Sequence, residues 1–525
     1  MAPRSHPFAA TIPSMSRLSA LRRGIEITAV LTAAGSDWFA ASMGVRGCRD
    51  LSCRWRCAIG ASNCPHHAAM EEPLQDRLVK VVERLGPTFV KAGQTLALRP
   101  DIVPIRFAHA LSRLHEGVEP FDGEAARRLV AEELGLPLSR LFTEFETEPF
   151  AAASLSQVHR ATLTDGTLVA VKVQRPGLER QVENDMHLLR VLARGVELVR
   201  PAAGGLRPSE AVAEVTATLR RELDFQQEGR VTDRVRISFQ DDPGIVIPTV
   251  HWSHTSRRVL TLDFIDGIRP AAPTELRAGG LDPELVLDVG LRAMFQQIFD
   301  HGLFHADPHP GNLRLLPGNR VSFLDFGMFG RVGPAEQRRL ALVLWALIEG
   351  DGHGLATQLL RVASLRPGAA PEAFSAQVVD ELDQYVDDDG TKSIAGLLVG
   401  QLGAGAAHGI VFPRGLMLLA RALVNLEATA AIMAPDRDFS AMAGALLPEL
   451  VTLLAPTPAN LEEALSRNRL AYADVMLGLP DLLAELGQER RMTPVPPPRP
   501  RRIVSAAALG AAGALVASGL ARRRS

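Results

Sequence analysis

HADPHPGN at residues 305–312 and DFG at residues 325–327 are the stretches that decide the fold of this 525-residue chain. They place Asp307, Asn312 and Asp325 in the order that a kinase-type phosphoryl-transfer site requires. Such a site needs charge neutralisation by Mg²⁺ held on hard oxygen ligands. Asn312 and Asp325 are therefore the predicted metal ligands, and Asp307 is the predicted catalytic base that orients or deprotonates the attacking hydroxyl or water.

The surrounding sequence predicts the local structure that this site needs. Apolar runs at residues 313–316 and 321–324 predict two short strands, and PGN at residues 317–319 predicts the turn between them. After DFG the chain enters a predicted helix near Ala335 almost at once, without an activation segment or an Ala-Pro-Glu motif. Because little surface is left for a peptide, the sequence favours a small molecule, a lipid headgroup or water as phosphoryl acceptor.

An upstream hairpin supplies the lysine that a kinase-type site requires. An Asp-Gly turn separates a predicted strand at residues 158–163 from the strand LVAVKV at residues 168–173, which carries Lys172. This lysine needs a carboxylate from a helix packed behind the strand, and spacing alone leaves Glu222 and Glu228 open as its partner. A lysine in such a strand is usually a solvated edge residue, so the interpretation depends on all the motifs occurring in the required order.

The expected glycine-rich phosphate loop is missing. AAASLSQVH at residues 151–159 stands in its place, and alanine cannot adopt positive φ as cheaply as glycine. The sequence therefore predicts a stiffer phosphate loop, formed by Ala152, Ala153 and Ser154.

With these motifs together, the chain resembles the UbiB/AarF-type atypical kinase-like proteins. It carries their lysine-x-Gly-Gln signature as KAGQ at residues 91–94, together with QVH at 157–159 and ELD at 222–224. The resemblance runs from about Pro73 to the helices after Pro334. We therefore expect an α+β protein with a bilobal protein-kinase-like fold, an N-terminal helical extension, a largely helical C-lobe extension and a C-terminal transmembrane helix.

The resemblance also implies an enzyme that binds ATP or ADP with Mg²⁺ and acts in isoprenoid-quinone metabolism at membranes. It places Lys91 and Gln94 in a helical extension over the nucleotide cleft. It pairs Lys91 with Glu222 and Asp224, which leaves Glu228 as the expected partner of Lys172. The nucleotide-contacting residues expected in all are Lys91, Gln94, Ala152, Ala153, Ser154, Lys172, Glu222 and the hinge residues Leu262, Asp263 and Phe264, the hinge meeting adenine through its backbone.

Composition bounds the remaining possibilities. The hydrophobic content of 46% can build a sizeable core, and the net charge of −2, with scattered arginines and few aromatic residues, speaks against a nucleic-acid partner. The four cysteines, at positions 48, 53, 57 and 64, contain no C-x-x-C pair, so unpaired thiols are favoured over a zinc site.

The predicted segments are a poorly defined N-terminal part (1–70), the KAGQ helical extension (71–145), the kinase-like core (146–335), a helical C-lobe extension (336–490), a Pro/Arg linker (491–502) and a transmembrane helix (503–521).

The last of these segments suggests a membrane anchor. Residues 503–521 carry no charge and are flanked by arginines. At about 1.5 Å per residue they span roughly 28 Å, just enough for a bilayer core. A single-pass anchor with a cytoplasmic kinase-like body is predicted, and a soluble alanine-rich tail is the alternative.

Three functional classes follow from these observations. The leading one is a membrane-associated ATPase or small-molecule/lipid kinase that supports isoprenoid-quinone biosynthesis or lipid homeostasis. The alternatives are a protein serine/threonine kinase, which the missing activation segment disfavours, and a nucleotide-binding pseudokinase scaffold, which the intact metal ligands disfavour. The expected partners are a nucleotide, a membrane lipid or isoprenoid-quinone precursor, and quinone-biosynthesis proteins.

Overall fold

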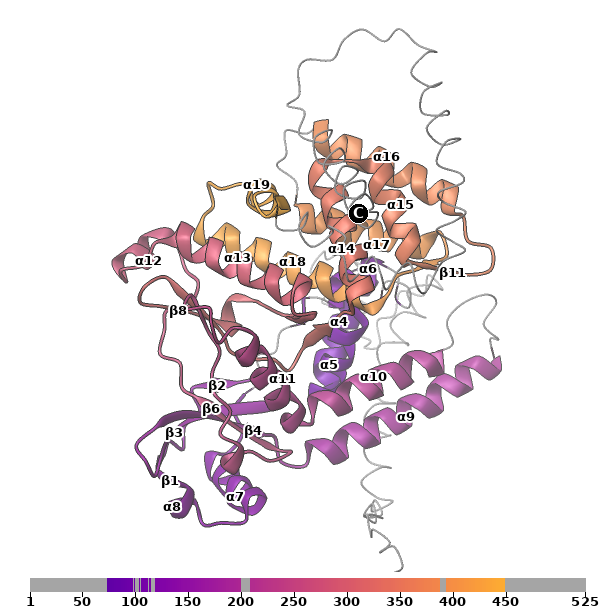
Figure 1. Cartoon of the computed structure of the whole chain (residues 1–525). Coiled ribbons are helices and arrows are strands. Elements are labelled where there is room, and N and C mark those ends of the chain that lie inside the picture. Colours follow the sequence, from indigo (N-terminus) through magenta and orange to yellow (C-terminus); the bar gives the residue numbers. More distant parts are fainter. Residues whose placement is uncertain are drawn as a thin grey trace, which may run out of the picture. The chain divides into compact units, whose positions relative to one another are not determined.

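The computed structural model divides the chain into two compact units, residues 1–445 and 446–525, and every element named below lies in the first (Figure 1). The structure describes residues 73–97, 99, 103, 105–111, 113–114, 119–199, 208–387 and 393–448. The cysteine cluster, the Pro/Arg linker and the predicted transmembrane helix at residues 503–521 lie outside these ranges.

An antiparallel sheet of five strands forms the first half of the fold. β3 (Ser156–Leu163) pairs with β4 (Leu168–Gln174) on one side and with β1 (Phe142–Phe145) and β2 (Ala151–Ala152) on the other. β6 (Val259–Asp263) pairs with the free side of β4. The predicted β3–β4 hairpin is confirmed, and its turn uses a glycine at φ +89°, as the Asp-Gly pair indicated.

The alternation of side chains along β4 separates the core from the site. Val169, Val171 and Val173 are fully buried and pack in one cluster with α7 (Gly123–Leu134). Because successive strand residues point to opposite faces, Lys172 lies on the other face of the sheet, away from this cluster. Burial of the valines thus fixes the direction of the lysine.

Helices before and within the sheet region bring distant segments together. α9 and α10 lie side by side, α5 packs on α10, and α11 packs on β6 (Figure 1). The KAGQ segment on α5 therefore lies near the acidic end of α10 and the first turn of α11. The helices of this part are α4 (Leu74–Leu85), α5 (Pro87–Ala97), α6 (Ile105–Leu111), α7, α8 (Leu138–Leu141), α9 (Leu178–Val199), α10 (Pro208–Glu222) and α11 (Phe225–Ser238).

Small sheets carry the two motifs of the second half. β8 (Leu313–Leu316) pairs antiparallel with β9 (Arg320–Phe323), as predicted, through a turn in which Gly318 and Asn319 have φ of +81° and +57°. Both left-handed residues suit the twist of a tight hairpin. β9 also pairs in parallel with β5 (Ile245–Val246). β7 (Leu303–His305) leads into the HADPHPGN loop, β10 (Phe329–Arg331) follows DFG, and these two strands pair antiparallel.

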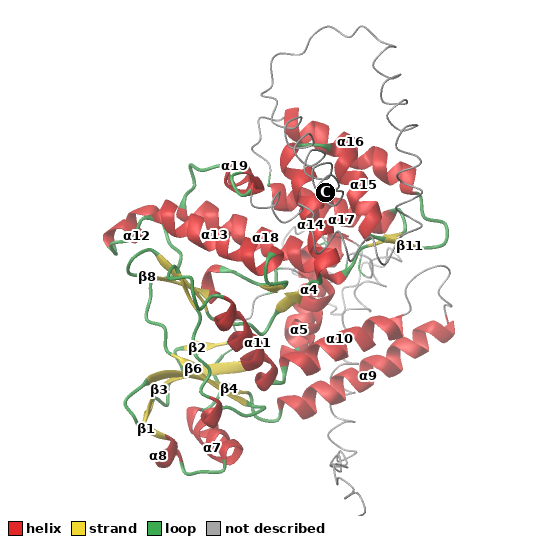
Figure 2. Ribbon diagram, viewed as in Figure 1, coloured by secondary structure: helices red, strands yellow, loops and turns green. Residues whose placement is uncertain are grey.

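Helices dominate the chain after β10 (Figure 2). α14 begins at Pro334, which confirms the helix predicted directly after DFG. α18 packs on α13, so it lies against the helix that precedes the HADPHPGN loop. The remaining elements are α12 (Pro273–Ala278), α13 (Pro283–Phe299), α14 (Pro334–Glu349), α15 (Gly352–Val362), β11 (Ser364–Leu365), α16 (Pro371–Asp387), α17 (Ile394–Ala407), β12 (Ile410–Val411), α18 (Arg414–Met433) and α19 (Phe439–Gly444).

The α+β class with an N-terminal antiparallel sheet and helical regions is confirmed. Among the described residues, α18 alone is long and apolar enough to cross a bilayer. Most of α18 is buried inside the protein, as in an ordinary core helix, so it is weak evidence for a membrane span.

Candidate functional site

Lys172 is held between two carboxylates. Its Nζ lies 2.8 Å and 3.0 Å from the Glu228 carboxylate oxygens and 2.9 Å from Oδ2 of Asp325. Glu228 comes from the first turn of α11 and is 5% exposed. Of the two carboxylates that spacing left open, the structure thus places Glu228 against the lysine, while Glu222 approaches Lys91 instead.

One ammonium group is shared between the buried carboxylate of Glu228 and the partly exposed carboxylate of Asp325, which leaves the cluster short of positive charge. Burial opposes the charged form of Lys172, but Asp325 and Glu228 outweigh it and raise the lysine pKa. Burial likewise disfavours charged Asp325, yet Lys172 and the Gly327 N–H, which donates at 2.8 Å, hold the Asp325 pKa well below its usual range. Burial and the Asp325 charge raise the pKa of Glu228 to about 7. A further cation would relieve this competition.

Asp307 is engaged by two residues of α18. Its Oδ2 accepts a hydrogen bond of 2.9 Å from Nη2 of Arg421, and its Oδ1 accepts from Nε of Arg421 at 3.3 Å and from Nδ2 of Asn425 at 2.7 Å. Burial would raise the pKa of Asp307, but the Arg421 guanidinium holds it below its ordinary value. The carboxylate is therefore charged, fixed in orientation and a weak proton acceptor.

Sequence reasoning missed Arg421 and Asn425. They lie more than 100 positions beyond Asp307, in a helix interpreted only as apolar core. A signal was present, because the two polar side chains are four positions apart and so share one face of an otherwise apolar helix.

Hydrogen bonds within the HADPHPGN loop fix its shape. Asn312 donates from Nδ2 to the backbone oxygen of Asp307 at 3.2 Å, and the Asp307 N–H donates to Nδ1 of His305 at 3.1 Å. Burial lowers the pKa of His305 to about 4, so its ring is neutral and can accept this bond. The ring also packs on Phe326, with centroids 5.1 Å apart, and so joins the two motifs.

The alanine-rich loop is held by hydrogen bonds rather than by glycine geometry. Arg175 donates from Nε and Nη2 to the Ala153 oxygen at 3.2 and 3.1 Å, and from Nη2 to the Glu119 oxygen at 2.8 Å. The Ala153 N–H donates to the Ser156 oxygen at 2.8 Å. Next to these bonds, the Oγ of Ser154 is fully buried and has no hydrogen-bond partner within the described part of the chain.

These side chains surround a cavity of about 70 Å³, which we call the central cavity. This volume is below the range of about 300–1,000 Å³ typical of small-molecule sites, so a whole nucleotide would extend beyond it. The predicted residues that line the cavity are Lys91, Ala153, Ser154, Lys172, Glu222, Glu228, Asp307, Asn312 and Asp325.

Two predicted contacts of the helical extension need correction. Gln94 does not line the cavity; α5 packs on α6 at that side, so its amide is buried and donates to the Leu114 oxygen at 3.0 Å. Lys91 does approach Glu222, at 3.5 Å. Asp224, its second expected partner, instead accepts from a backbone N–H in the first turn of α11 at 3.1 Å. Capping of that helix uses the carboxylate.

The hinge also differs in detail from the prediction, and neither Ala152 nor Leu262 lines the central cavity. The backbone N–H of Asp263 donates to the Thr249 oxygen at 3.0 Å, and that of Phe264 donates to the Leu168 oxygen at 3.1 Å. Both groups complete strand pairing and are not available to adenine. The backbone N–H of Ile265 has no hydrogen-bond acceptor among the described residues, so it is the candidate donor of the hinge.

The donor set of the central cavity fits Mg²⁺ bound together with phosphates. Asn312 and Asp325 offer hard oxygen ligands on one wall, and the unpartnered Ser154 hydroxyl faces the same space. No group of three or more histidine, cysteine or acidic side chains that could hold a metal occurs in the described ranges. Mg²⁺ commonly takes only one or two protein ligands and completes its shell with phosphate oxygens and water.

Comparison with known proteins identifies the family of the chain. The ABC1 atypical kinase-like domain matches residues 113–359. "Probable protein kinase UbiB" of Xanthomonas oryzae pv. oryzae is 35% identical over 389 residues, covering 71% of this chain and 70% of that protein. The protein of the same name from Xylella fastidiosa (strain 9a5c) is 34% identical over 389 residues, covering 73% and 70%. Among solved structures, the complex of Rv3197 with erythromycin from Mycobacterium tuberculosis shares 21% identity at a TM-score of 0.42, over 70% of this chain and 97% of that one.

Proposed function

Since the chain belongs to the UbiB family of atypical kinase-like proteins, we propose that it is a membrane-associated ATPase or small-molecule/lipid kinase that supports isoprenoid-quinone biosynthesis or lipid homeostasis. The observation that carries the proposal is the Lys172 cluster, in which one ammonium group bridges Glu228 and Asp325 beside Asn312 and Asp307. This is the charge arrangement that phosphoryl transfer from a nucleotide needs.

The proposed roles follow from these contacts. Lys172, positioned by Glu228, holds the nucleotide phosphates, with Ser154 as a further phosphate donor. Asn312 and Asp325 hold Mg²⁺, which when bound neutralises phosphate charge. Lys91 and Glu222 cover the cavity, and the cleft opens at this cover to admit ATP or ADP. The proposal keeps the segment boundaries predicted from the sequence, including a membrane anchor at residues 503–521.

Asp307 acts in this proposal by orientation more than by proton affinity. Arg421 and Asn425 occupy its oxygens and keep it charged, so it accepts a hydrogen bond from the attacking group without taking its proton early. A loose phosphoryl-transfer transition state requires little base strength, which makes positioning the larger contribution.

The chain after Asp325 supports a small acceptor. β10 pairs with β7 directly, and α14 follows at Pro334, so no extended segment is present between residues 325 and 334 to bind a peptide. A lipid, a small molecule or water is the proposed acceptor.

Nucleotide affinity with and without Mg²⁺ tests this proposal. We expect Mg²⁺ to tighten ATP or ADP binding to the natural protein, and Asp325→Asn to abolish that effect because the charged ligand is lost. Arg437→Gln, a charge change at a half-buried residue that lines neither cavity, is the control and should leave the Mg²⁺ effect intact. Affinity that depends equally on Mg²⁺ in Asp325→Asn would remove the metal assignment.

A further inference from the structure

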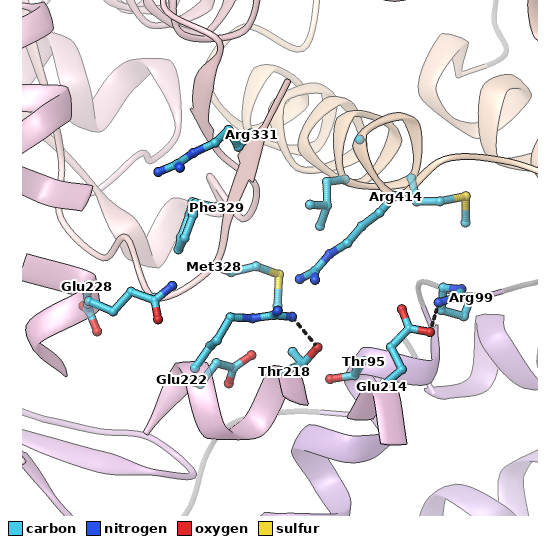
Figure 3. A pocket seen from close by; sticks show the side chains of 16 residues that line it. Thr95, Arg99, Glu214, Thr218, Glu222, Glu228, Met328, Phe329, Arg331 and Arg414 are labelled. Atoms are coloured by element: carbon cyan, nitrogen blue, oxygen red, sulfur yellow. Dashed lines mark hydrogen bonds and ion pairs between the residues drawn. The ribbon is translucent and has the colours of Figure 1, made fainter. Parts of the chain in front are cut away.

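A second and larger cavity of about 390 Å³ adjoins the central cavity. Helices α5 and α10, the start of α18 and the loop after DFG line it (Figure 3). The two cavities share Glu222, Glu228, Gly327 and Met328. The volume lies in the range of about 300–1,000 Å³ typical of small-molecule sites. We call it the arginine pocket, and the roles proposed above leave it without a ligand.

Four arginines line this pocket, and three of them lack a carboxylate partner. Arg99 forms an ion pair with Glu214, drawn as a dashed line in Figure 3. In the part of the chain that the structure describes, no carboxylate lies within ion-pair distance of Arg221, Arg331 or Arg414. All three side chains are exposed, so a ligand can reach them from solvent.

The acidic residues of the pocket do not balance these charges. Besides the glutamate on Arg99, the lining includes only Glu222, which contacts Lys91, and Glu228, which contacts Lys172. Each lining carboxylate therefore already has a cation of its own. The pocket keeps a surplus of positive charge.

Two of the unpaired arginines also lie close enough to repel each other. Although Arg414 remains accessible to solvent, partial burial lowers its pKa and the neighbouring Arg221 guanidinium lowers it further, while Glu214 and Glu222 act in the opposite direction. Arg221 itself has only a neutral partner, since it donates to the Thr218 hydroxyl at 3.1 Å. Like charges placed together cost free energy that a bound anion would relieve.

An apolar wall stands beside the charged one. Met417 and Leu418 are buried under the pocket, and the half-buried Met328 and Phe329 lie between Arg331 and Arg414 in Figure 3. A free inorganic anion would leave this surface in contact with water. A ligand with both an anionic and an apolar part would cover it.

We propose that the arginine pocket binds an anionic amphiphile, a molecule with a phosphate or carboxylate head and an apolar body. The head lies against Arg221 and Arg414, with Arg331 at its side, and the body lies on Met328 and Phe329. Because the pocket shares the loop after DFG with the central cavity, its occupant lies next to the proposed phosphoryl-transfer site. Binding itself does not depend on that proposed function.

Calorimetric titration with octyl phosphate below its micellar concentration tests the proposal, with Mg²⁺ and saturating ADP present to block the nucleotide cleft. We expect octyl phosphate to bind at least tenfold more tightly than octanol or inorganic phosphate. The double variant Arg221→Gln/Arg414→Gln should weaken it at least tenfold, and the single variant Arg331→Gln severalfold. Arg437→Gln, outside the pocket, is the matched control and should bind as the natural protein does.

Equal affinity of the natural protein and the double variant, or inorganic phosphate binding as tightly as octyl phosphate, would overturn the proposal. Unchanged melting temperature and ADP affinity in the variants separate loss of this pocket from misfolding and from failure of the nucleotide site. Binding to vesicles of phosphatidylcholine with and without phosphatidic acid shows whether the ligand of the arginine pocket is a membrane headgroup or a free amphiphile. Loss of vesicle binding in the double variant points to a membrane headgroup, and retained vesicle binding with lost octyl phosphate binding points to a free amphiphile.

Discussion

Replacement of Arg421 by alanine tests how firmly α18 holds the proposed catalytic aspartate. The substitution removes both guanidinium contacts to Asp307 and leaves only the bond from Asn425. The side chains of Arg421 and Asp307 are 22% and 16% exposed, so the abandoned carboxylate would be mostly buried. Because a partly buried charge then loses its partner, we expect a clear loss of stability.

The magnitude follows from this burial. Removing one partner of a fully buried ion pair costs about 3–5 kcal/mol. Partial exposure and the remaining Asn425 bond reduce this to about 2 kcal/mol, or roughly 2 °C in melting temperature for a unit of residues 1–445, because the unfolding entropy grows with chain length. The control is Arg437→Ala, whose ion pair with Asp288 is 2.9 Å long with side chains 31% and 48% exposed. An exposed pair of this kind is worth about 0–1 kcal/mol.

A double-mutant cycle measured by thermal unfolding tests whether Arg421 stabilises the protein through its contact with Asp307. In the Asp307→Asn background the charge is gone, so Arg421→Ala should lower the melting temperature by less than half as much as it does in the natural protein. Equal losses in both backgrounds, or a loss no larger than that of Arg437→Ala, would refute the reasoning that Arg421 acts through Asp307.

Three further predictions follow from the central cavity. Binding of Mg²⁺–nucleotide at Asp325 should lower the Glu228 pKa from about 7, so Glu228 should release protons near neutral pH. This release would make the calorimetric binding enthalpy depend on the buffer, and Glu228→Gln should show no such dependence. Lys172→Met leaves the carboxylates of Glu228 and Asp325 without a cation, so their pKa values in the folded protein rise. Because both are more fully charged at pH 8 than at pH 6, the loss of melting temperature should be larger at pH 8. A loss independent of pH would mean that packing alone is affected. Gln94→Leu should change stability by removing the bond to Leu114 while leaving ATP affinity within about twofold, because the side chain does not line the cavity, and a large loss of affinity would restore it to the nucleotide site.

The strands that carry the site could be predicted from sequence because their signals are local. Alternating apolar residues and an Asp-Gly or Pro-Gly-Asn turn specify both hairpins, and the burial of Val171 and Val173 then determines where Lys172 points. The order of the motifs was enough to bring Asp307, Asn312 and Asp325 to one cavity.

The remaining features depend on packing between distant segments. Spacing along the chain did not separate Glu222 from Glu228. The family resemblance made Glu228 the expected partner of Lys172, and the structure confirms it, because α11 packs on β6. Asp224 could pair with Lys91 or cap α11, and in the structure its carboxylate accepts from the nearby backbone N–H of that helix. Arg421 and Asn425 required knowledge that α18 packs on α13, beside the catalytic loop.

Phosphate release from ATP by the purified full chain is the most direct test of the central claim. The assay contains Mg²⁺ and compares the natural protein with Asp307→Asn, with and without membrane lipid. We predict Mg²⁺-dependent release that rises with lipid and is lost in Asp307→Asn, although that variant still binds nucleotide. No release despite Mg²⁺-dependent nucleotide binding, or equal release by Asp307→Asn, would contradict a phosphoryl-transfer role for this site.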